Sequence, residues 1–194
     1  MDIGTIVSST SHIEYFCQVY HPGDTPEPPA PADYGLGTFV GLEQAGGGLL
    51  VGVIANTALQ NPEFGNLGPR ISPQEELPVF APDYMIEKAT LVAVVILGSL
   101  DSEGVAMQSV PAIAPQIDTV VRTLEEEEIV RFHRSETSLR VAYLPMLASL
   151  PNLLMPHLTL SVLEQLQTLF PDEAQRLSLL SGNLAWKSRV EPVS

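Results

Sequence analysis

Short runs of β-branched and aromatic residues, separated by polar or glycine-rich stretches, fill the first two thirds of the chain and predict β-strands. The first two runs, residues 3–8 and 13–20, lie on either side of four polar residues and predict an opening strand pair. In the second run Cys17 alternates in phase with Tyr15 and Val19. This phase predicts a small buried thiol in the core and not a nucleophile.

A glycine-rich turn joins the next two predicted strands. Residues 34–43 resume the strand pattern, and residues 46–48 are three glycines that lead into a strand at 49–55, as expected for a hairpin. The most apolar run follows at residues 87–97, where the last seven residues are all hydrophobic. A strand without polar positions is buried on both faces, and Gly98 is expected to end it.

Two further strands, residues 117–121 and 129–132, are predicted to complete the sheet around a turn of four glutamates at residues 125–128. The glutamates are interpreted as a solvated turn, with a docking surface for a basic partner or a mimic of a phosphate backbone as the alternative. Two stretches rich in Pro, Gly and Asn, residues 61–69 and 72–82, are predicted to be irregular. Six or seven strands without helical crossovers indicate a mainly β fold, either an antiparallel barrel or a sandwich.

The pattern changes to a helical period in the last third, so we expect a barrel over residues 1–132 and a leucine-rich helical tail over residues 133–194. Ser161 and Glu164 have the spacing of a capping box, while Pro171 and Gly182 are expected to begin and end a second helix. A two-helix unit this short cannot bury its own apolar face, which must pack on the barrel, on a second copy or on a partner. The candidate interface residues are Leu163, Leu166, Leu169, Phe170, Leu177 and Leu180.

The net charge of −14 belongs to the barrel region. Residues 1–132 contain 18 acidic and 4 basic side chains, whereas residues 133–194 contain 5 of each. Proteins bind nucleic acids largely through Lys and Arg, which neutralise the phosphates and release their counterions. A surface as acidic as this one repels phosphate backbones, so direct nucleic-acid binding is not expected. The tail carries no net charge that would oppose self-association, so a homo-oligomer is expected.

The sequence contains none of the local motifs that we sought for nucleotide binding, metal binding or nucleophilic catalysis. A Walker A loop needs a Gly-Lys pair, and the chain has none. His12, His21, His133 and His157 stand singly, without the spacing of metal ligands, and there is no G-x-S-x-G elbow. We therefore expect no cofactor, no metal, no catalytic residue and no enzymatic activity, although an enzyme with a dispersed site is a third class to weigh.

Cysteine content and hydropathy bear on location. One cysteine excludes an internal disulfide and fits a reducing compartment. The longest apolar run has the length of a strand, far from the roughly 18 residues that would span a bilayer, and the first residues are acidic and polar. A cytoplasmic protein without a membrane segment or a secretory signal is expected.

The order of the elements gives a resemblance. A leading strand ends in small polar residues, a hairpin turns on glycines, and a long apolar strand is followed by a proline-bearing crossover. The segments are IGTIVSST (3–10), GLGTFV (35–40), LVGVI (50–54), NP (61–62), KATLVAVVILG (88–98) and VP (110–111). This order, over about two thirds of the chain, resembles the HAS barrel, the small β-barrel shared by HerA-type DNA-translocating ATPases and F-type ATP synthase subunits.

The resemblance implies a small antiparallel HAS-like barrel that packs at subunit contacts and receives partner proteins such as a nuclease. HerA-type ATPases continue into a RecA-like domain with Walker motifs, which this chain lacks. We therefore expect a non-catalytic assembly or adaptor protein whose partner is a HerA-like ATPase or nuclease. The alternative is an OB-like barrel that binds a small ligand or single-stranded nucleic acid, which would need a groove with exposed aromatic and basic side chains.

Overall fold

The computed structural model describes residues 1–44, 46–61, 89–135 and 138–190, with side chains described as far as residue 184. The two hairpins predicted from the sequence are confirmed. Strand β1 (Asp2–Ser9) pairs antiparallel with β2 (Glu14–Val19), and β3 (Phe39–Glu43) pairs with β4 (Leu49–Gln60) across the glycine turn.

The later strands close the sheet on itself. β5 (Ala89–Leu100) pairs with β4 on one side and with β2 on the other, and β7 (Val120–Thr123) joins β1 to β3. A short strand, β6 (Ala106–Met107), extends the sheet beyond β5. In the part of the chain that is described, the six strands in the order β1-β2-β5-β4-β3-β7 therefore form a closed antiparallel barrel. This confirms the mainly β fold and decides between the barrel and the sandwich that the strand pattern left open.

Alternating side chains of the barrel belong to two separate cores. Those that point inward, such as Leu50, Ile54 and Val94, pack with Cys17 inside the barrel. Those that point outward from β3, β4 and β5 pack against the helices. Both faces of β5 are buried over residues 94–98, which confirms the prediction for the apolar run.

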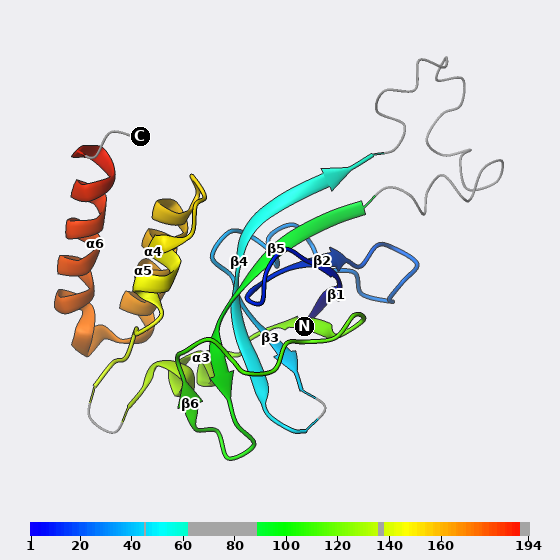
Figure 1. Ribbon diagram of the computed structural model, residues 1–194, viewed down its shortest axis with the longest axis horizontal. Helices are drawn as coiled ribbons and strands as arrows, with labels where there is room; N and C mark the ends of the chain where they lie inside the picture. Colours follow the sequence, from blue (N-terminus) through cyan, green and yellow to red (C-terminus); the bar gives the residue numbers. More distant parts are fainter. Residues whose placement is uncertain (45, 62–88, 136–137, 191–194) are drawn as a thin grey trace.

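The helices cover this outer face of the barrel (Figure 1). They are α3 (Glu126–His133), α4 (Leu144–Ser149), α5 (Met155–Leu169), the short 3-10 helix η1 (Pro171–Glu173) and α6 (Ala174–Val190). α5 is tied to the barrel by Gln165, whose side-chain amide donates to the Gly37 carbonyl at 2.9 Å. Among the described helices, none has the length and hydropathy needed to cross a bilayer.

The predicted strand at residues 129–132 is wrong, because these residues form most of α3. The glutamates before it do not make a turn but start the helix. The Glu128 carboxylate accepts from the Glu125 backbone N–H at 3.0 Å and pairs with both terminal nitrogens of Arg122 at 2.8 Å each. Acidic side chains in the first turn also suit the helix dipole, and Ile129, Phe132 and His133 then share one buried face.

Three predicted element ends are also wrong. β5 passes through Gly98, where a bulge shifts its register against β4 and where a Cβ atom would overlap the Met107 carbonyl oxygen. The capping-box residue Ser161 lies inside α5, which starts six residues earlier with Pro156 in its first turn. α6 continues through Gly182 to Val190.

Two predictions fall outside what the structure describes or tests. The irregular stretches at residues 61–69 and 72–82 lie, except for Asn61, outside the described residues. The boundary expected between residues 132 and 133 falls inside α3. The core beneath the helices takes side chains from both sides of that boundary, including Phe39, Val53, Leu158 and Leu166.

Candidate functional site

His133 lies at the centre of the contact between the helices and the barrel. Its Nδ1–H donates to the Ile129 carbonyl at 2.8 Å, and its Nε2 accepts from the Tyr143 hydroxyl at 2.8 Å. The rings of Phe39, Phe132 and Phe170 surround it edge-on. Burial lowers the pKa of the imidazole to about 4 and raises that of the Tyr143 phenol, so the pair is a neutral, fully hydrogen-bonded element of the core.

Cys17 is confirmed as a core thiol. It is fully buried inside the barrel, and burial raises its pKa to about 12. A thiol with so high a pKa holds its proton at neutral pH and is a poor nucleophile. His12, which the sequence places near it, instead has its Nε2 at 2.8 Å from the Pro111 carbonyl.

The candidate interface residues of the tail lie in the contact between the helices and the barrel of one chain. Leu163, Leu166, Phe170 and Leu177 are buried in that core, and Leu169 and Leu180 are partly buried against it. In this structure the apolar face therefore packs on its own barrel, which was one of the alternatives. Self-association through the tail stays a prediction that measurement of mass has to decide.

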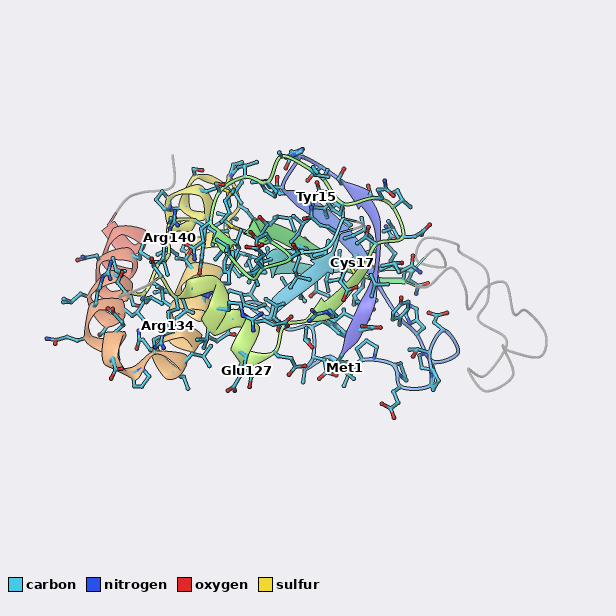
Figure 2. The ribbon with its side chains drawn as sticks, turned by 90° about the horizontal axis from the view of Figure 1, so that it is seen from below. Met1, Tyr15, Cys17, Glu127, Arg134 and Arg140 are labelled. Carbon is cyan, nitrogen blue, oxygen red and sulfur yellow. The ribbon has the colours of Figure 1, made fainter. Side chains whose placement is uncertain are left out.

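The outer face of α3 and the start of β6 form the walls of a groove of about 900 Å³, which we call the arginine groove. Residues 104–106 line one wall, and Glu126, Glu127, Val130 and Arg131 of α3 line the other. Arg134, Ser135 and Arg140 lie at the far end. Figure 2 shows Glu127 near the start of α3 and Arg134 and Arg140 on the side of the helical part.

The three arginines of the groove are positioned by packing and by their backbone. The stem of Arg131 lies over Gly104, where a Cβ atom would be 3.0 Å from its Cδ. The Arg134 guanidinium stacks 5.8 Å above the centre of the Phe170 ring. The Arg140 backbone N–H donates to the His133 carbonyl at 2.7 Å, which brings residue 140 back to the end of α3.

Gln108 fixes the floor of this region. Its buried side-chain amide donates to the carbonyls of Phe132 and Arg140 at 3.0 and 2.9 Å, and its carbonyl oxygen accepts from the Ala142 N–H at 2.7 Å. One side chain thus joins the end of β6, the end of α3 and the segment that carries Arg140. A groove held this way is largely formed before any ligand arrives.

The three arginines have no carboxylate within ion-pairing distance among the residues that the structure describes. By contrast, Arg122 pairs with Glu128 and Glu43, and Arg176 pairs with Glu173. Three exposed, unpaired guanidinium groups on one groove are unexpected in a chain of net charge −14. They mark the arginine groove as the candidate site for an anionic group.

A second hollow of about 340 Å³ lies next to this groove and shares Gly104 and Arg131 with it. The glycine turn lines it, together with Glu43, Asp101, Glu103 and Glu128. The carboxylates make it a poor place for a phosphate. Across the described ranges there is no cluster of His, Cys, Asp and Glu that would hold a metal ion.

Sequence reasoning missed the arginine groove because residues 129–132 were assigned to a strand. The signal was present: Arg131 and Arg134 are three apart, a spacing that places both on one side of a helix. The position of Arg140 in the groove could not be predicted from the local sequence. It depends on the hydrogen bond from Gln108, 32 residues earlier in the chain, to the Arg140 carbonyl.

The sequence matches a family model described as "Domain of unknown function (DUF8166)" over residues 1–193. No curated protein matches the chain.

Proposed function

Because the chain belongs to the DUF8166 family, whose description assigns no function, we propose from its geometry that it is a non-catalytic assembly or adaptor protein that docks a protein partner in the arginine groove. The observation that carries this proposal is a preformed groove with three arginines that form no ion pair with any described residue. Binding energy at protein interfaces concentrates in a few residues, and arginine is among the most frequent of them.

The surroundings of the groove support a protein partner. Val105 is 61 % exposed and Val130 is partly buried, so apolar surface lies beside the guanidinium groups. A mixed apolar and charged lining is what protein interfaces present, whereas a phosphate-binding site would gather cations and exclude Glu126 and Glu127. The resemblance to the HAS barrel supports a HerA-like ATPase or nuclease, in the cytoplasm, as the partner to test first.

A photo-crosslinking experiment in cells tests the proposal. A benzophenone amino acid is placed at Val105, inside the groove, and in a control at Leu59, which is 80 % exposed on β4 and does not line the groove. We expect a discrete crosslinked protein from position 105 only, identified by mass spectrometry. The crosslink should disappear when Arg134→Glu and Arg140→Glu are added, and should persist with Arg176→Glu. Identical products from both positions, or none from position 105, would contradict docking in the groove.

A further inference from the structure

We propose that the arginine groove binds an extended acidic segment of the partner, with carboxylates on Arg131, Arg134 and Arg140 and apolar side chains against Val105 and Val130. This inference rests on the proposed function and adds the chemical class of the partner segment that the groove binds. Carboxylate is the matching group because a guanidinium presents its donors as a planar fork that two carboxylate oxygens can accept together.

The groove offers the edge of a sheet to an extended chain. β6 is the last strand in the order of the sheet, so within the described residues its outer edge has no strand partner. Ala106 of this two-residue strand lines the groove, together with Gly104 and Val105 immediately before it. Peptides commonly add to such edges as a further strand, and alternate side chains then carry the specificity.

The spacing of the arginines suits alternate positions of a strand. Arg131 is on α3 and Arg134 is its C-terminal cap, so residues three apart there bring their Cβ atoms to about 5–6 Å. In an extended segment, side chains two apart on one face are roughly 7 Å from each other. Long arginine side chains absorb this difference, so the geometry favours acidic residues at alternate positions with apolar residues between them.

A peptide fits the charges of the groove better than a nucleic acid does. Glu126 and Glu127 line the same groove, and the neighbouring hollow adds Asp101 and Glu103. A polyanion that followed the groove would meet these carboxylates in a chain of net charge −14. A short segment with a few carboxylates can reach the three guanidinium groups without following the groove along Glu126 and Glu127.

Fluorescence anisotropy with defined peptides tests the inference. The probe is labelled Gly-Ser-Glu-Val-Glu-Val-Glu-Gly-Ser, and the control peptide has Gln in place of each Glu. At about 50 mM salt we expect the glutamate peptide to bind at least about tenfold more tightly than the glutamine peptide, and to weaken at about 150 mM. Replacing Arg134→Ala and Arg140→Ala together should weaken binding about tenfold or more, whereas Arg176→Ala, an exposed arginine outside the groove, should leave it within about twofold.

Other outcomes would overturn the inference. They are equal binding of the two peptides, insensitivity to the groove substitutions in a protein with unchanged circular dichroism, or tighter arginine-dependent binding of a short single-stranded oligonucleotide. A concentration-dependent rise in mass that the same substitutions abolish would make a second copy the occupant, and would also overturn it. A partner crosslinked at position 105 together with no peptide binding would leave the adaptor function standing and remove only the acidic segment. Peptide binding without a crosslinked partner would show that the groove accepts acidic segments, and would remove the proposed docking of a partner in cells.

Discussion

Lowering the pH from 7 to 4 is expected to destabilise the contact between the helices and the barrel through His133. The imidazole has a pKa of about 4 in the folded protein and an ordinary value of 6.5 when unfolded. Below pH 6.5 the unfolded chain takes up a proton that the folded core excludes, so folded stability is complete above pH 6.5 and is lost as the pH falls towards 4. At 1.36 kcal/mol for each pH unit, the loss amounts to about 3 kcal/mol.

Urea unfolding at a series of pH values measures this loss. With a urea dependence of roughly 1–3 kcal/mol per molar, a loss of about 3 kcal/mol lowers the midpoint by about 1–3 M. Glu128 also contributes stability that is lost in acid, because the hydrogen bond from Arg122 holds the pKa of its carboxyl below the ordinary value of 4.5. The His133→Gln variant isolates the histidine, because it removes the titrating group while keeping a donor and an acceptor. Its free energy of unfolding should fall between pH 6.5 and 4 by about 3 kcal/mol less than that of the wild type.

The matched control is His157→Gln, the same change at an exposed position. This variant should keep the pH dependence of the wild type. The reasoning fails if His133→Gln loses stability as steeply as the wild type does, or if nuclear magnetic resonance titration gives His133 a pKa near 6.5.

Four further predictions address the groove floor, the tail and the absent chemistries. Gln108→Leu removes the hydrogen-bond partner of one buried and two partly buried backbone groups and should lower the free energy of unfolding by about 1–3 kcal/mol in urea titration, whereas Gln116→Leu, at an exposed position, should not. Leu166→Glu together with Leu169→Glu should lower the melting temperature without changing the mass measured by light scattering. Leu179→Glu, on an exposed part of α6, should change neither quantity. Conversion of an oligomer to a folded monomer would instead show that the apolar face of the tail packs between copies. Purified protein should not hydrolyse ATP, since no Gly-Lys pair is present, and an ATPase rate abolished by a point substitution in this chain would contradict this. Mobility shifts at about 150 mM salt should show no binding of duplex or single-stranded DNA, and micromolar binding would favour the OB-like alternative.

The barrel strands were predictable because each is encoded locally. Alternation fixed the inward face of β2, glycines marked the turn between β3 and β4, and a continuous apolar run marked β5 as buried on both faces. Closure of the barrel was not predictable, since the pairing of β2 with β5 joins residues more than seventy positions apart.

The error at α3 has a tertiary cause. Four glutamates followed by Ile129 and Val130 suit a turn and a strand as well as a helix start. Arg122 on β7 favours the helix, because it holds Glu128 over the first turn with two hydrogen bonds. That arginine is in place only once β7 has paired with β1 and β3, so a local pattern cannot supply it. The same error hid the arginine groove, whose second wall is this helix.

α3 serves the core and the groove with opposite faces. Ile129, Phe132 and His133 are buried beneath it, whereas Arg131 and Arg134 face the groove and are exposed. Gln108 joins the two roles, since its contacts hold both the end of the helix and the backbone of the segment that presents Arg140. We therefore expect charge substitutions on the outer face to change the proposed partner binding with little effect on the fold. Changes beneath the helix, including protonation of His133, should loosen the fold and the groove together, because the position of the guanidinium groups depends on a helix that the core holds in place.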